Sequence, residues 1–78
     1  MSRPVKRSLT IKGHRTSVSL EDEFWQAFRD IATRHNRPIN ELAAEIDRDR
    51  GTETGLATAI RLFVLADLQK SNLDDVGH

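Results

Sequence analysis

The chain of 78 residues contains no cysteine and no tyrosine, and it holds one tryptophan, two prolines and four glycines. Without cysteine the protein forms neither disulfides nor thiolate zinc sites. A domain this small buries only about 60% of its unfolded surface, and such domains usually gain stability from disulfides, metals or oligomerisation. The three histidines lie far apart, so we expect no metal site. Self-association is therefore the expected source of additional stability.

Long apolar runs are also missing from the sequence. The most apolar stretch, residues 56–68, is too short and too interrupted to span a bilayer, and residues 1–12 lack the apolar run of a signal peptide. No nucleophile accompanies a general base, and no glycine-rich loop is present to hold a phosphate group. We therefore expect a cytoplasmic protein that is not an enzyme and uses no cofactor and no membrane.

Acidic residues are absent before Glu21. The residues ahead of it include five cations: Arg3, Lys6, Arg7, Lys12 and Arg15. The remainder carries twelve acids against seven cations, so the net charge of zero divides into a +5 segment and a −5 body. Basic arms commonly approach phosphate, and a merely solvated tail is the alternative. We expect a flexible basic arm over 1–6, a single domain over 7–70 and a flexible tail over 71–78.

Residues 15–20 alternate between polar and apolar side chains, and residues 7–12 do the same. Successive side chains of an extended chain point to opposite faces, so each stretch predicts a strand with one apolar face. A two-residue loop over 13–14 joins them into a hairpin that sets Ile11 opposite Thr16. A single long, bent extended arm is the alternative. With either arrangement, we expect the second strand to pair with its equivalent in another copy.

Three helices are predicted over 21–35, 39–50 and 55–70. Asn36 and Gly51 tolerate the left-handed conformation that ends the first two. The third is apolar around well over half of its circumference, and a helix of this kind must be buried on several sides. One copy of a chain this small has too little other mass to cover it. This is a second argument for a dimer.

Strand, helix, short turn and helix follow one another within residues 15–50. Arg15-Thr-Ser-Val-Ser-Leu20 runs directly into Glu21-Asp-Glu-Phe-Trp25, and Pro38-Ile-Asn-Glu-Leu42 begins the second helix. In order and spacing these motifs resemble the ribbon-helix-helix DNA-binding family. The flanking Lys6-Arg-Ser-Leu and Arg61-Leu-Phe-Val-Leu65 resemble a small bacterial subgroup with an extra C-terminal helix. The resemblance implies a mainly α-helical homodimer with a short N-terminal ribbon of antiparallel intersubunit strands and a third helix.

The resemblance also implies roles for individual residues. Arg15, Ser17 and Ser19 would meet base edges in the major groove of double-stranded DNA, because arginine and serine both hydrogen-bond there. The free backbone N–H groups around Ile39 and Asn40 would hold a phosphate. Further phosphate contacts are expected from Lys12, His14 and Arg37. The expected dimer core comprises Val18, Leu20, Phe24, Phe28, Leu42, Ile46, Ile60 and Phe63.

The function implied is that of a bacterial transcription regulator, such as a repressor, that acts as a homodimer. The alternative is a protein-interaction or antitoxin-like dimer that holds a protein partner through its apolar third helix. Asn36-Arg37-Pro38 replaces the usual glycine of the turn between the first two helices. If residues 7–12 pair with 15–20, the ribbon of the dimer widens to four strands, which fit the major groove less easily.

Overall fold

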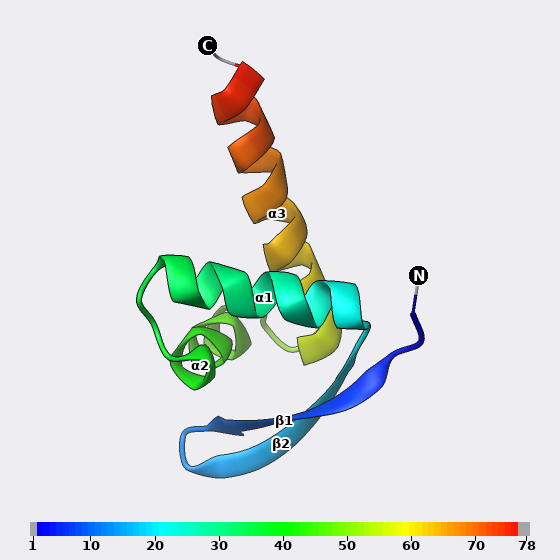
Figure 1. Ribbon diagram of the computed structural model, residues 1–78. Helices are drawn as coiled ribbons and strands as arrows, with labels where there is room; N and C mark the ends of the chain where they lie inside the picture. The colour runs from blue at the N-terminus through cyan, green and yellow to red at the C-terminus, as the bar shows by residue number, and fades with distance from the viewer. Residues whose placement is uncertain (1, 77–78) are drawn as a thin grey trace.

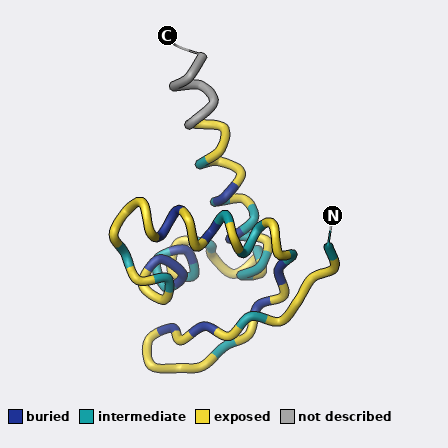
Figure 2. The backbone as a smooth tube through the Cα atoms, in the orientation of Figure 1, coloured by how far each residue is buried: buried dark blue, intermediate teal, exposed yellow. Residues whose placement is uncertain are grey.

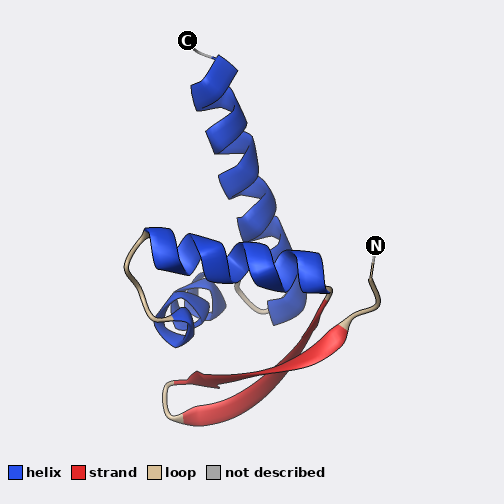
Figure 3. Cartoon of the chain, viewed as in Figure 1, coloured by secondary structure: helices blue, strands red, loops and turns tan. Residues whose placement is uncertain are grey.

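The computed structural model describes residues 2–76, with side chains described as far as Lys70. A hairpin of β1 (Val5–Ile11) and β2 (His14–Leu20) leads into α1 (Asp22–Arg34), α2 (Ile39–Asp49) and α3 (Leu56–Val76). Figure 1 shows the hairpin curving beneath α1 and α2, while α3 leads away from it. The sheet and the helices therefore form two layers (Figure 3). Within the described residues, no helix is long and apolar enough to cross a membrane.

The hairpin turn consists of Lys12 and Gly13, whose φ angles of 53° and 79° are those of a type I′ turn. The loop predicted over 13–14 is therefore wrong by one residue, because glycine takes the second loop position and not the first. Ile11 consequently pairs with His14 and not with Thr16. The pairing moves by two residues, so each side chain stays on its predicted face. The bent-arm alternative is excluded, since β2 pairs with β1 of its own chain.

The ends of the elements differ from the predicted bounds most at the start of β1 and the end of α3, and by at most one residue elsewhere. β1 begins at Val5, so the last two residues of the arm expected over 1–6 lie in the sheet. α3 continues to Val76 and so includes most of the tail expected over 71–78, whose last two residues lie outside the described part of the chain. Asn36 and Gly51 follow α1 and α2 with φ angles of 53° and 74°, which confirms their left-handed conformation.

A single hydrophobic core fills the space between the inner face of the hairpin and the three helices. In Figure 2, buried and exposed positions alternate along the strands, as a sheet covered on one side requires. The hairpin contributes four buried residues, including Leu20, and the helices complete the core with Phe28, Ile60 and others. The ring of Phe28 meets the ring of Phe63 edge to face at 6.2 Å between centroids.

Most residues expected in the dimer core are buried within one copy of the chain. Phe24 and Phe63 are half-buried against the core. The other six are buried outright: Val18, Leu20, Phe28, Leu42, Ile46 and Ile60. One copy also covers more of α3 than the sequence predicted, since Val64 is buried beside Ile60. Among the side chains of α3 that the structure describes, those of Leu62, Leu65 and Leu68 remain about half exposed, at 56%, 48% and 51%.

Candidate nucleic-acid interface

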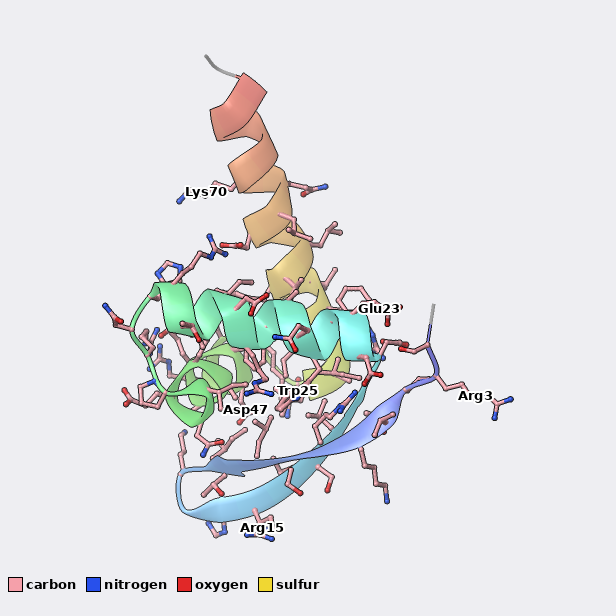
Figure 4. The ribbon with its side chains drawn as sticks, viewed as in Figure 1. Arg3, Arg15, Glu23, Trp25, Asp47 and Lys70 are labelled. Atoms are coloured by element: carbon pink, nitrogen blue, oxygen red, sulfur yellow. The ribbon has the colours of Figure 1, made fainter. Side chains whose placement is uncertain are left out.

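The outer face of the hairpin is wholly polar. It carries six exposed side chains, three from each strand: Lys6, Ser8, Thr10, Arg15, Ser17 and Ser19. We call this set the ribbon face. Its members lie opposite one another as the pairs Lys6–Ser19, Ser8–Ser17 and Thr10–Arg15. In Figure 4, Arg15 points away from the helices into solvent. The face therefore presents four hydroxyl groups and two cations on one surface of a two-stranded sheet.

The period of the strand places these side chains outside. Leu9, Val18 and Leu20 are drawn into the core, and because successive residues alternate, their polar neighbours must point the other way. The three residues predicted to meet base edges, Arg15, Ser17 and Ser19, therefore share one face, as the sequence indicated. Their partners on β1, Lys6, Ser8 and Thr10, were not among the residues predicted to contact DNA. The same polar–apolar alternation over residues 7–12 was the signal that could have identified them.

The hairpin retains its positive charge. Lys6, Lys12 and Arg15 are exposed, and none of them forms an ion pair with any acid in the described part of the chain. Arg7 differs because it lies on the inner face and pairs with Asp22. Most arginines of the helices are paired with carboxylates, as Arg61 is with Glu21 at 3.0 Å. Arg3, Arg29 and Lys70 are also exposed without an ion pair in the described part of the chain, but the hairpin carries three such cations on one short element.

The backbone of β2 faces outward along one edge. The carbonyl of Ser19 on β2 accepts from Arg61 at 3.1 Å, and at the opposite edge of the sheet the N–H of Thr10 on β1 donates to Asn40 Oδ1 at 3.0 Å. In an antiparallel ladder alternate residues turn their backbone groups away from the partner strand. Arg15 and Ser17 belong to the same outward set as Ser19. No further contact to their backbone is found among the described residues, so this edge can accept another strand.

Arg61 of α3 holds the end of β2 in place. Its Nε donates to Glu21 Oε1 at 3.0 Å, its Nη2 donates to the Ser19 carbonyl, and its guanidinium lies 5.9 Å from the centroid of Phe24. The hydrogen bond from Arg61 lowers the pKa of the Glu21 carboxyl below its ordinary value. The third helix is therefore tied directly to the strand that carries Ser17 and Ser19.

Two residues near the N-terminus hold the same junction from the other side. Arg7 donates to the Leu20 carbonyl at 3.4 Å, pairs with Asp22 and lies 5.6 Å from the centroid of Trp25. The Ser2 hydroxyl accepts the N–H of Asp22 at 3.0 Å and donates to the Glu23 carboxylate at 2.6 Å, which lowers the pKa of Glu23. Ser2 thereby caps α1, a helix that has no cap from the side chain of Glu21.

The residues predicted to meet phosphates occupy several different places. Lys12 and His14 are exposed at the hairpin turn. Ile39 and Asn40 begin α2, and the bond from Thr10 to Asn40 brings this helix end beside β1. The first backbone bonds of the helix come from Glu41 and Leu42 to the carbonyl of Pro38, so the N–H groups of Ile39 and Asn40 precede the helical ladder. Arg37 is turned toward Glu45, with which it forms an ion pair.

The described residues contain no cluster of three His, Cys, Asp or Glu side chains that could hold a metal ion. The arrangement defines a class of small helical protein that presents a polar, basic two-stranded ribbon, a form that fits the major groove of DNA.

The comparison with protein families agrees with this class. The model of the ribbon-helix-helix domain matches residues 4–68, which is most of the chain. The chain belongs to the ribbon-helix-helix family, whose members are typically DNA-binding transcription regulators. No curated protein and no solved structure matches the chain.

Proposed function

We propose that the protein is a homodimeric, sequence-specific DNA-binding regulator of transcription that sets its ribbon face into the major groove. The observation that carries the proposal is the ribbon face itself, with exposed hydroxyl groups and cations that have no acidic partner among the described residues. Membership of the ribbon-helix-helix family supports the same function. Such a protein works where the DNA lies, which in a bacterium is the cytoplasm, and a repressor is the simplest form of it.

Arg15, Ser17 and Ser19 are the residues proposed to read the bases. Arginine donates two hydrogen bonds to O6 and N7 of guanine, and serine donates or accepts at several bases. A bidentate pair of this kind contributes about 1–3 kcal/mol of discrimination against the wrong base. All three side chains are exposed on β2, and the strand is fixed at its end by Arg61. A fixed strand supports recognition because little freedom is lost on binding.

The phosphate contacts are proposed for groups on either side of the reading strand. The N–H groups at the start of α2 favour an anion, and Lys12 and His14 at the turn add donors. Arg37 joins them by exchanging Glu45 for a phosphate. Contacts of this type contribute much of the affinity and little of the sequence preference.

The proposed dimer joins two copies along the outward edge of β2. Antiparallel pairing about a twofold axis would satisfy the backbone of Arg15 and Ser17 and give a four-stranded sheet with the order β1-β2-β2-β1. Membership of the ribbon-helix-helix family supports the pairing of two copies, whereas the flanking β1 strands are added by this chain's own hairpin. In this dimer the intersubunit ribbon consists of the two β2 strands, and β1 flanks it on both sides.

The experiment that tests the function is a titration of labelled duplex DNA from upstream of the protein's own gene, at several salt concentrations. We expect specific binding that weakens steeply with salt, and we expect Arg15→Ala with Ser17→Ala to abolish the preference for that DNA over unrelated duplex. Lys70→Ala is the matched control, since Lys70 is an exposed cation on α3 far from the ribbon face (Figure 4). Absence of binding to any upstream DNA at low salt would contradict the proposal.

One observation favours a second role. Leu62, Leu65 and Leu68 leave an apolar strip exposed on α3, and such a strip suits a protein partner, as in an antitoxin-like dimer. Purification of the tagged protein from its native cell distinguishes the two roles. A stoichiometric partner that is lost when these leucines are changed to serine supports the second role, and a dimer without a partner disfavours it.

A further inference from the structure

β1 presents a second row of donors beside the proposed reading strand. Lys6, Ser8 and Thr10 are exposed on the ribbon face, each directly opposite a residue of β2. Their donors are one ammonium group and two hydroxyl groups, all of which bind phosphate oxygens well. Lys6 forms no ion pair with any acidic residue in the described part of the chain. The family resemblance includes Lys6-Arg-Ser-Leu9 but implied no DNA contact for this strand, because the residues to which it gave such contacts begin at Lys12.

The width of the sheet determines which part of the DNA each strand can reach. Neighbouring strands lie about 4.8 Å apart, so in a four-stranded sheet the outer strands lie roughly 7 Å from the twofold axis. The major groove is about 12 Å wide, which places its walls roughly 6 Å from its centre. Two central β2 strands fit between the walls. The two β1 strands therefore meet the sugar–phosphate backbone and not the bases.

The contact between β1 and α2 supports the same placement. Asn40, at the start of α2, accepts the N–H of Thr10 through its side chain. The first N–H groups of α2, which suit a phosphate, therefore lie beside the strand that carries Ser8 and Thr10. Strand and helix end then form one continuous row of donors along a single DNA strand.

We propose that Lys6, Ser8 and Thr10 of β1 form a phosphate-binding row that flanks the base-reading strand. The inference rests on the proposed function and deepens it, because it divides the ribbon face into a central strand that specifies sequence and an outer strand that supplies affinity. It also accounts for the departure from the simplest family pattern: the added strand widens the sheet but does not prevent docking, since it lies against the groove walls.

The test compares three variants for their affinity, salt dependence and sequence preference. Removing Lys6 from both copies by Lys6→Ala should reduce the slope of log K against log salt by about 2, and should weaken binding on the order of 30-fold at 0.15 M salt. Cognate and unrelated duplex should weaken by the same factor. Ser8→Ala with Thr10→Val should lower affinity for both duplexes without changing the slope, because hydroxyl groups release no counterion. Arg15→Ala should instead reduce the preference for cognate DNA.

Lys6→Arg, which keeps the charge, should restore the slope, and Lys70→Ala should leave every quantity unchanged. An unaltered slope in Lys6→Ala would overturn the inference while leaving the proposed function intact. A change of base preference in the Ser8→Ala, Thr10→Val variant would also overturn it, because β1 would then read bases and the hairpin of a single copy would occupy the groove. If the unaltered protein binds no DNA, the proposed function fails and the inference fails with it.

Discussion

Two arginines, Arg7 and Arg61, reach the junction between β2 and α1 from opposite sides. Each donates to a backbone carbonyl of that junction, pairs with a carboxylate and lies against an aromatic ring. The flat guanidinium group suits this combination, because it offers several donors in one plane and stacks on rings. These arginines therefore fix the direction of β2, the proposed reading strand, whereas Arg15 on the ribbon face is held by no ion pair in the described part of the chain.

The lowered pKa of Glu21 gives the junction a pH dependence. A carboxyl whose pKa is lower in the folded than in the unfolded protein contributes stability above its unfolded value, and this contribution is lost as the pH falls through the folded value. We expect the urea midpoint of the protein to fall between about pH 5 and pH 3, the range in which glutamates titrate. Glu21→Gln should show a weaker dependence over the same range. Equal pH dependence in both proteins would contradict this assignment.

The turn residue Gly13 has a φ of 79°, a conformation that side-chain-bearing residues adopt only with strain. A Cβ there would meet no atom within 4 Å, so the whole effect of Gly13→Ala comes from the backbone. We expect a loss of about 1–2 kcal/mol in the free energy of unfolding, measured by urea titration. Gly55→Ala is the matched control, since it has equal space and no positive φ, and it should not destabilise.

At the scale of the element, β2 separates two functions onto its two faces. Leu20 is fully buried and carries packing, whereas the adjacent Ser19 is exposed and carries the proposed recognition. Because the strand period is two, neighbouring residues can be changed with opposite consequences. The same division holds on β1, where Leu9 is buried between the exposed Ser8 and Thr10.

Substitutions at these neighbouring positions should therefore affect different measurements. Leu20→Ala should lower the free energy of unfolding by about 2–5 kcal/mol, because it removes a fully buried side chain. Ser19→Ala should change it by no more than about 0.5 kcal/mol and should weaken the preference for cognate DNA. Thermal unfolding and DNA titration distinguish the two effects. A large loss of stability in Ser19→Ala would show that the ribbon face also contributes to folding.

At the scale of the whole molecule, one copy completes its core but leaves two features exposed. The edge of β2 has outward backbone groups, and the strip of Leu62, Leu65 and Leu68 lies on α3. The first suits an identical strand and forms the basis of the proposed dimer, whose mass would be twice the 8.9 kDa of one chain. The leucine strip lies apart from the ribbon face, so a protein bound to the strip would not block the proposed binding of DNA.

Proline provides a direct test of the dimer edge. Ser17→Pro removes an N–H that points away from β1. The hairpin should stay folded, because an edge strand tolerates proline where the missing N–H would face solvent. An antiparallel partner on β2 would lose this bond, and we expect sedimentation to show single chains. Ser8→Pro is the matched control on the outer edge of β1 and should leave the dimer intact. If Ser17→Pro still sediments as a dimer with a folded hairpin, the copies associate elsewhere.

The sequence predicted much of the site because the relevant properties are local. Three helices and two strands were expected close to where they lie, and the exposure of Arg15, Ser17 and Ser19 followed from their alternation with apolar residues. The turn was misplaced by one residue. A loop over 12–13 and a loop over 13–14 both place the apolar side chains of the two strands on the same face, so the alternation could not distinguish them. The roles of all the predicted DNA-contact residues stay predictions. For Asn40 and Arg37 the structure adds that their side chains contact Thr10 and Glu45.

The sequence by itself determined which side chains lie on each face of each element and where the positive charge gathers. Backbone geometry fixes the periods of strand and helix residue by residue, so these features need no knowledge of distant contacts. Only the tertiary structure decided that β2 pairs with β1 of its own chain, that Arg61 reaches Ser19 and that Asn40 reaches Thr10. The last two contacts join residues 42 and 30 positions apart, and they depend on how the helices pack over the sheet. A local pattern specifies which face of an element is apolar but not which other element packs against that face, because this packing depends on how the whole core is buried.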